Sequence, residues 1–226
     1  MYTHSVLLSR PTGASPVRTI PDPAAALTPA GERIHDVAAR LFYERGIRAT
    51  GVDLVADEAG TTKKTLYDRF GSKDGLVAFY LGRRRLRWQR FVLDRLDGVA
   101  SGLPRILAMY DALAEWLADA SRGCGFVNAH AEIAGTDHPG LAVVHAEKAW
   151  ARALYVEFSR DAGVADPETV GTGLFLLHEG AVVASTAGGV TDAVAVARQS
   201  ARALVAGAVA AASPGAADSV VAEPVR

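Results

Sequence analysis

Apolar residues recur at helical spacing along most of the chain. In the first third, four stretches show this spacing, at 29–45, 52–59, 62–70 and 72–97. The first is the clearest, because Ile34, Val37, Ala38, Leu41 and Phe42 fall on one helical face. Polar capping residues and glycines stand at the boundaries of these stretches. The pattern predicts a bundle of three short helices followed by a long one.

Four or five longer helices are predicted after a break at Gly98, Gly102 and Pro104. Gly, Pro or Asp marks their boundaries, and the expected ranges are 104–121, 126–134, 139–161, 167–187 and 192–212. No alternating strand pattern is seen, so the predicted fold class is all-α. Half of the residues are hydrophobic, which is enough for a core, and the longest apolar run is too short to span a bilayer. We therefore expect a soluble protein without a membrane partner.

The two ends of the chain lack a periodic apolar face. Residues 1–28 carry four prolines, and 213–226 is rich in small residues and proline. Such segments bury too little surface to order themselves, so we expect a flexible arm and a flexible tail. Deleting the arm should leave thermal stability unchanged. The body then divides into a first domain, 29–80, and a second, 81–212.

Charge is distributed unevenly between these parts. Residues 29–95 hold 14 Lys and Arg against 9 Asp and Glu, whereas residues 96–226 hold 8 against 15. A basic segment joined to an acidic one suggests that the first meets a polyanion, although solvated surface charge is the simpler alternative. The single cysteine, Cys124, excludes an internal disulfide, and no secretory signal is visible, so we expect a cytoplasmic protein.

The stretch VDLVADEAGTTKKTLYDRF, residues 52–70, has the organisation of a helix-turn-helix motif. A two-turn helix, a turn at Gly60 and a second short helix follow one another. Thr62 can cap the second helix, and polar residues at its start can reach phosphates or base edges. Leu66 and Phe70, four residues apart, are expected to dock it on Phe42 and Val55.

These residues carry a resemblance to a known family. The strings YERGIRATGVDLVADEAG, TKKTLYDRF and GSKDGL resemble the TetR family of bacterial transcriptional regulators over residues 29–80. A later stretch, RGCGFVNAHAEIAGTDHPG, is similar to one that follows the fifth helix in that family. The resemblance implies a homodimer whose N-terminal domains bind a palindromic double-stranded operator. It also implies a C-terminal domain that binds a small-molecule effector.

Carried over by position, the resemblance implies a set of DNA-binding residues in and around the second motif helix. These are Thr50, Thr62, Lys63, Lys64, Thr65, Tyr67 and Lys73. Thr50 and Lys73 would hold phosphates. The chain departs from the family pattern at Gly51, Thr61 and Lys64, so the operator sequence cannot be inferred.

Other reactive residues form no recognisable catalytic or metal site. The basic run 83–90 is expected to be a solvated helix face or a general attraction for DNA, because it lies about 18 Å along the helix from Ser72. The six histidines lack the i, i+4 spacing and third ligand of a helical zinc site. Cys124 is expected to be a small buried residue, with a redox-sensing thiol as the alternative. We expect no cofactor, no metal and no catalytic residue.

Aromatic and histidine side chains in the acidic half could line an effector pocket, although the same residues would suit an ordinary core. The candidates are Tyr110, Trp116, Phe126, His130, Trp150, Tyr155, Phe175 and His178.

A dimer interface is expected on the last two helices, whose small residues would allow close approach in a four-helix bundle. Packing of these faces within one chain is the alternative. The candidates are Gly173, Leu177, Gly180, Ala181, Ala184, Ala197, Ala201, Leu204, Val205 and Ala208.

The sequence thus predicts a ligand-responsive, DNA-binding transcriptional regulator, a repressor released by an effector. The alternative is a helical enzyme or ligand carrier with an appended DNA-binding head. The effector and the regulated genes cannot be read from the sequence, nor can any response of Cys124 or the histidines to redox state or metal.

Overall fold

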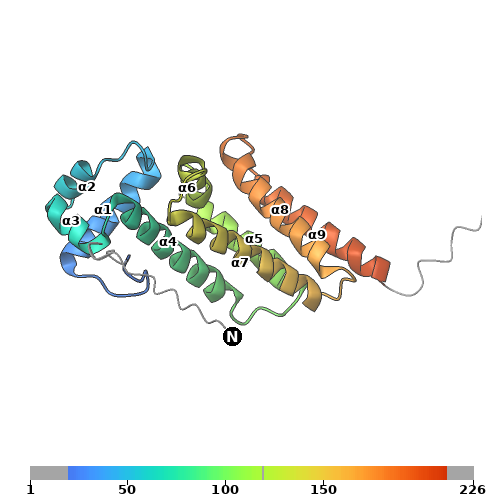
Figure 1. Ribbon diagram of the computed structural model, residues 1–226. Coiled ribbons are helices and arrows are strands. Elements are labelled where there is room, and N and C mark those ends of the chain that lie inside the picture. Colours follow the sequence, from blue (N-terminus) through green and yellow to red (C-terminus); the bar gives the residue numbers. More distant parts are fainter. Residues whose placement is uncertain (1–19, 119, 213–226) are drawn as a thin grey trace, which may run out of the picture.

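The computed structural model describes residues 20–118 and 120–212, and within these ranges all regular structure is helical (Figure 1). The predicted all-α fold is confirmed. The helices are α1 (Pro29–Arg45), α2 (Val52–Glu58), α3 (Lys63–Phe70), α4 (Lys73–Leu96), α5 (Leu103–Leu117), α6 (Gly125–Ile133), α7 (Gly140–Asp161), α8 (Pro167–Thr186) and α9 (Ala193–Ala212).

Local side-chain caps fix where several helices begin. Thr28 Oγ1 accepts the Gly31 amide at 3.3 Å and Ser72 Oγ accepts the Gly75 amide at 2.9 Å. Each cap satisfies an amide that has no partner within the helix. The predicted helices agree with the structure to within about a residue, except that α5 ends at Leu117 instead of 121. Leu117 is the last large apolar residue before a run of small and polar ones.

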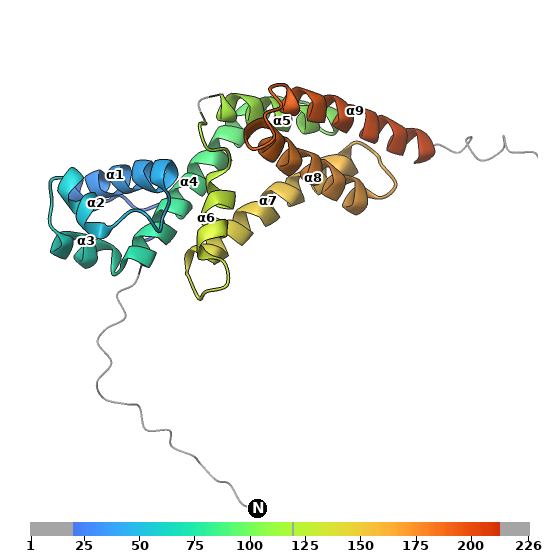
Figure 2. The ribbon, with the colours of Figure 1, turned by 90° about the horizontal axis from the view of Figure 1, so that it is seen from above.

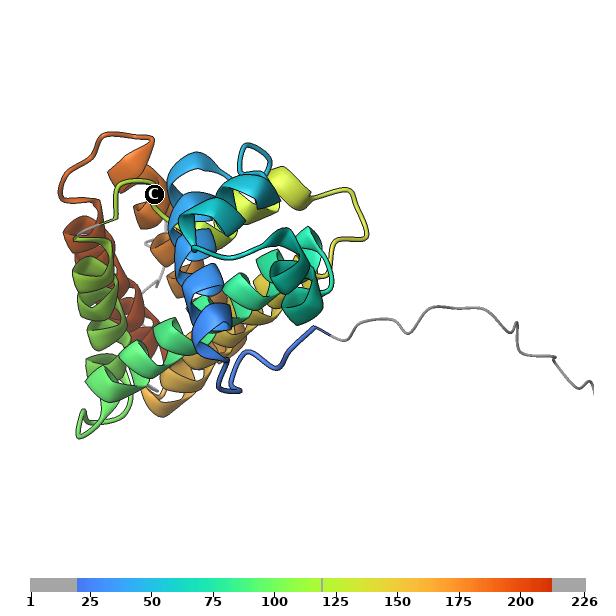
Figure 3. The same cartoon turned by 90° about the vertical axis from the view of Figure 1, so that its left-hand side faces the viewer.

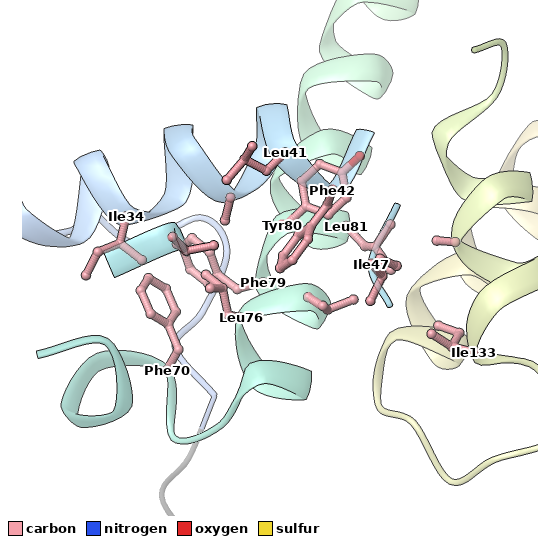
Figure 4. Close-up of a cluster of buried hydrophobic side chains, with 14 of the residues drawn as sticks. Ile34, Leu41, Phe42, Ile47, Phe70, Leu76, Phe79, Tyr80, Leu81 and Ile133 are labelled. Carbon is pink, nitrogen blue, oxygen red and sulfur yellow. The ribbon is translucent and has the colours of Figure 1, made fainter. Parts of the chain in front are cut away.

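Two hydrophobic clusters share the long helix α4. The first cluster joins α1, α2 and α3 to residues 76–81 of α4 and to α6 (Figure 4). The second joins residues 88–96 of α4 to α5, α7, α8 and α9. The expected domain boundary after residue 80 therefore falls inside one continuous helix, which runs from α1–α3 to the middle of the molecule beside α5 (Figure 2).

The segment before α1 is packed more closely than the sequence suggests. Arg83 Nε donates to the Pro23 carbonyl at 3.1 Å, and Ile20 and Leu27 lie against the first cluster. Gly82 allows this approach, since a Cβ there would stand 2.4 Å from Pro23 Cγ. The prediction of a flexible arm is therefore wrong for residues 20–28. The composition of this segment could not reveal that Arg83, far away in the sequence, binds its backbone. Residues 1–19 and the predicted tail, 213–226, lie outside the described residues.

We predict that Arg83→Met lowers the free energy of unfolding by about 1 kcal/mol. Arg83 also bridges Glu32, at 2.8 Å and 3.0 Å, and holds the pKa of that carboxyl below its usual range. Urea unfolding would measure the change, with the exposed Arg90→Met on the same helix as control. Equal urea midpoints for the two variants would contradict the anchoring role of Arg83.

Candidate DNA-binding surface and ligand cavity

The helix-turn-helix motif lies at one end of the molecule, where α2 and α3 face outward (Figure 3). The turn between them passes through Gly60, at a φ of 59° that suits glycine. Arg33 Nε of α1 donates to the Ala59 carbonyl at 3.2 Å. The turn is thus held from beneath, which fixes the angle at which α3 is presented.

Helix α3 has one buried face and one exposed face. Leu66 and Phe70 are fully buried in the cluster that contains Phe42 and Val55, as the sequence predicts. Thr62 accepts the Thr65 amide at 3.1 Å, which caps the helix. The outward residues are the polar ones predicted to meet DNA. Thr62, Lys63, Lys64 and Tyr67 are exposed, and Thr65 is half-buried.

The two lysines of α3 engage nearby carboxylates on the surface. Lys63 Nζ lies 2.5 Å from Asp53 Oδ1 of α2, and Lys64 Nζ lies 2.6 Å from Asp68 Oδ2. The Lys64 side chain remains 85% exposed. Solvated pairs of this kind contribute little to stability, so either lysine can exchange its carboxylate for a phosphate at small cost.

Thr50 does not lie where the resemblance implies. It is fully buried, and its hydroxyl donates to the Gly46 carbonyl at 2.7 Å and contacts the Leu41 carbonyl at 3.3 Å. Those bonds close the turn after α1 and leave no group for a phosphate. The expected DNA contact of the Thr50 side chain is therefore wrong, and its role is to terminate α1.

Lys73 stands at the first position of α4, directly after the Ser72 cap. It is half-buried, and that burial lowers the pKa of its ammonium, while the carboxylates of Asp74 and Glu132 oppose the shift. A lysine at a helix start adds positive charge to free amides, which together attract a phosphate.

Helix α6 is bonded directly to the turn that follows α1. Glu132 accepts the Ile47 amide at 2.9 Å and the Arg48 amide at 2.7 Å, and Arg48 Nε donates to the Glu132 carbonyl at 2.9 Å. Gly46 makes room for that carboxylate, because its φ is 95° and a Cβ would lie 2.9 Å from Glu132 Oε1. A displacement of α6 would thus reach the DNA-binding end of the molecule.

A small cavity opens beside the start of α6, with room for water-sized molecules over about 30 Å³ and about 380 Å³ of empty space when open solvent is included. Five helices supply its walls. The lining residues are Arg84, Trp88, Leu113, Trp116, Leu117, Cys124, Gly125, Phe126, Glu147, Lys148, His178, Glu179 and Val182.

Three of the eight predicted pocket residues line this cavity, namely Trp116, Phe126 and His178. The other five do not. Tyr110 and Tyr155 are buried in the second cluster, and Trp150 and Phe175 pack against it from the outside. His130 is exposed on α6. The pocket assignment is wrong for these five, because helical spacing alone cannot separate a core face from a cavity wall.

The polar lining residues Glu147, Lys148, Glu179 and Arg84 were missed. A signal existed for Glu147, which occupies the apolar stripe of α7 between Val144 and Ala151. An acid in such a stripe indicates a buried charge that needs a partner. Lys148 Nζ donates to Glu179 Oε1 at 2.9 Å and lies 3.5 Å from both Glu147 Oε2 and Cys124 Sγ.

His178 is buried at the floor of the cavity, with Nδ1 3.0 Å from the Tyr155 hydroxyl. Burial, aided by the charge of Lys148, lowers the pKa of His178 to about 3. The folded protein thus keeps this ring neutral at pH values where an unfolded chain protonates it, below about 6.5.

We expect the protein to lose stability as the pH falls from about 6.5 toward 3, by about 2 kcal/mol at pH 5 from His178 alone. Urea unfolding at pH 7 and pH 5 would measure the loss, which should be smaller in His178→Gln. Should that variant not fold, an NMR titration of wild-type His178 gives the same answer. A ring that protonates between pH 7 and pH 5 would contradict the expectation.

The expected dimer surface is partly used inside the chain. Ala181, Ala197, Ala201 and Val205 are buried in the second cluster, because α9 packs against both α5 and α8 and α8 packs against α7. Their assignment to an interface is wrong. Gly173, Leu177, Ala184 and Ala208 are half-buried, while Gly180 and Leu204 are exposed.

The outer face of α8 and α9 exposes further apolar residues, only some of which were predicted from the sequence. It consists of Leu176, Gly180 and Val183 on α8 with Val196 and Leu204 on α9. These two helices lie at the end of the molecule opposite α3 (Figure 1).

One group of acidic and histidine side chains in the described residues is close enough to hold a metal ion, namely Glu32, His35 and Asp36. The Glu32 carboxylate is already engaged by Arg83, as described above. We therefore assign no metal to it. None of the described helices is long and apolar enough to cross a membrane.

Comparison with known proteins supports the geometry. Residues 34–78 match the family described as bacterial regulatory proteins, tetR family. The crystal structure of SCO4454, a TetR-family transcriptional regulator from Streptomyces coelicolor, matches with a TM-score of 0.75 and 25% identity over 80% of this chain and 96% of that one.

Two protein relatives point the same way. The HTH-type transcriptional regulator Rv1255c of Mycobacterium tuberculosis is 28% identical over 62% of this chain and 67% of its own length. The HTH-type transcriptional repressor KstR2 of Rhodococcus jostii is 45% identical, but over only 30% of this chain and 32% of its own. These relatives are transcriptional regulators, and not the enzyme or carrier weighed above. Residues 34–78 thus form a DNA-binding domain of the TetR type, and the chain as a whole has the fold of TetR-family transcriptional regulators.

Proposed function

We propose that the chain is a repressor that binds a palindromic operator as a homodimer and leaves it when a small molecule enters the cavity. The observation that carries the proposal is the outward polar face of α3, formed by Thr62, Lys63, Lys64 and Tyr67. This face stands on a rigid base, because Leu66 and Phe70 are fully buried beneath it.

Two further observations support release by a ligand. The cavity is lined at the start of α6 by Phe126, and the end of the same helix holds the turn after α1 through Glu132. A ligand that displaces Phe126 would therefore move α6, a helix of nine residues, and with it the contact of Glu132 at the DNA-binding end. The repressor role is supported by the name of KstR2, and chromosomal DNA as target implies a cytoplasmic location.

Genome-wide footprinting of the tagged protein, with transcript measurement after deletion of its gene, tests the proposal. We expect a few protected sites with two half-sites about one helical turn apart, and raised transcription of the adjacent genes after deletion. Protection without symmetry would contradict the dimeric arrangement. Lowered transcription would contradict repression, and an absence of protected sites would contradict sequence-specific binding.

A further inference from the structure

The cavity carries information about the kind of molecule it can hold. Its walls are mainly apolar, and the aromatic rings of Trp88, Trp116 and Phe126 are among the lining side chains. The rings of Trp88 and Trp116 lie against each other with centroids 5.1 Å apart. The space is small, since only about 30 Å³ of it admits a water-sized molecule, so it suits a ligand of a single ring better than a long chain.

Among the described residues that line the cavity, Glu147 alone has a buried side-chain polar atom without a hydrogen-bond partner. It is only 3% exposed, and its Oε2 has no hydrogen-bond donor in the described protein. The nearest cation, Lys148, is 3.5 Å away and directs its 2.9 Å bond to Glu179 instead. A buried acceptor without a donor destabilises the protein, so a ligand that donates to Glu147 gains that free energy on binding.

The charged groups of the cavity balance one another. Two carboxylates, Glu147 and Glu179, stand against the ammonium of Lys148 and the guanidinium of Arg84. The lining charges sum to zero, so a ligand with a net charge would bring into a largely apolar space a charge that the lining as a whole does not balance. The cavity therefore favours a neutral molecule.

We propose that the cavity binds a neutral aromatic molecule with one hydroxyl or N–H group, which donates to Glu147 Oε2 while the ring lies against Trp88, Trp116 and Phe126. The inference deepens the proposed function by naming the chemical class of the effector, and it rests on that function only for the consequence at the operator. Binding itself can be tested without DNA.

Four single-ring probes separate the contributions. Phenol is neutral with a donor, toluene is neutral without one, benzoate is an anion and benzylammonium is a cation. Binding to the full chain is measured by tryptophan fluorescence, excited where the probes do not absorb. We expect phenol to bind about tenfold more tightly than toluene, the contribution of one hydrogen bond to a charged acceptor. Both charged probes should bind more weakly than phenol.

Glu147→Met tests the assigned acceptor, because methionine keeps the length of the side chain and removes the oxygen. Lys148 keeps its bond to Glu179, so its ammonium retains a carboxylate partner in the variant. The variant should bind toluene at least as well as wild type and lose the preference for phenol. Glu157→Met, at an exposed position of the same helix, is the control and should keep that preference.

The outcomes separate this inference from the proposed function. Tighter binding of benzoate or benzylammonium than phenol would overturn the inference, and so would a phenol preference that survives in Glu147→Met. Failure of all four probes to bind would overturn it too. In each case an operator titration without probe still tests DNA binding. Conversely, phenol that binds through Glu147 without weakening operator binding would support the site and contradict ligand-controlled release.

Discussion

A glutamate in place of Leu176 should convert the proposed homodimer to monomers and lower operator affinity at least a hundredfold. Leu176 is 63% exposed on the outer face of α8, next to Gly180, at which an added Cβ would meet no atom within 4 Å. We propose that the two chains of the homodimer meet through this outer face of α8 and α9. The substitution therefore leaves the single chain intact but buries an unpaired carboxylate between the two chains. A monomer has one DNA-binding domain, which buries too little DNA surface to bind an operator with high specificity.

Light scattering and an operator titration would measure both effects. Leu93→Glu is a matched control, since Leu93 is 53% exposed on α4, and it should stay dimeric. Ala201→Glu would be a poor test, because Ala201 is fully buried and its replacement would disturb the fold itself. A Leu176→Glu protein that remains dimeric and binds as wild type would place the interface elsewhere.

The second large effect is expected on α3. The double substitution Lys64→Ala with Tyr67→Ala should lower operator affinity by about a hundredfold, since each side chain that contacts a base edge contributes about 1–3 kcal/mol. Affinity for a shuffled duplex should fall much less. Fluorescence anisotropy with both duplexes at equal salt would measure the difference.

Two controls make that result specific. Arg90→Ala removes a positive charge from an exposed position of α4, and it should leave operator affinity nearly unchanged. Lys73→Ala should instead weaken both duplexes alike and reduce the salt dependence by about one unit, as expected for a phosphate contact. Equal losses on both duplexes for the α3 double variant would show that α3 binds DNA without reading its sequence.

Local patterns predicted the helices well because their causes are local. The cap of Thr62 on Thr65 and the burial of Leu66 and Phe70 follow from spacing within a single helix. Thr50 was misplaced because its partners, Gly46 and Leu41, bind it inward. A resemblance to a family predicts the type of residue at a position, but it does not predict in which direction a threonine hydroxyl points.

The cavity and the interface depend on contacts between distant helices, which spacing does not encode. Tyr110 and Trp116 both fall on the apolar side of α5, yet Tyr110 donates to the Leu174 carbonyl at 2.7 Å within the core and Trp116 borders the cavity. Small residues on α9 likewise suit either a neighbouring helix or a partner chain, and Ala197 and Ala201 are buried within the chain itself. Glu147 could have been predicted as a cavity residue from the sequence, since a charged residue within the apolar stripe of a helix indicates a functional site.

The most direct test of the central claim, that α3 reads DNA sequence, is the ratio of two affinities of the wild-type protein. One is for its footprinted operator and the other is for a duplex of equal length and shuffled sequence, both at the same salt concentration. The account predicts a ratio of about a thousand or more in favour of the operator. Equal affinity for the two duplexes would contradict it.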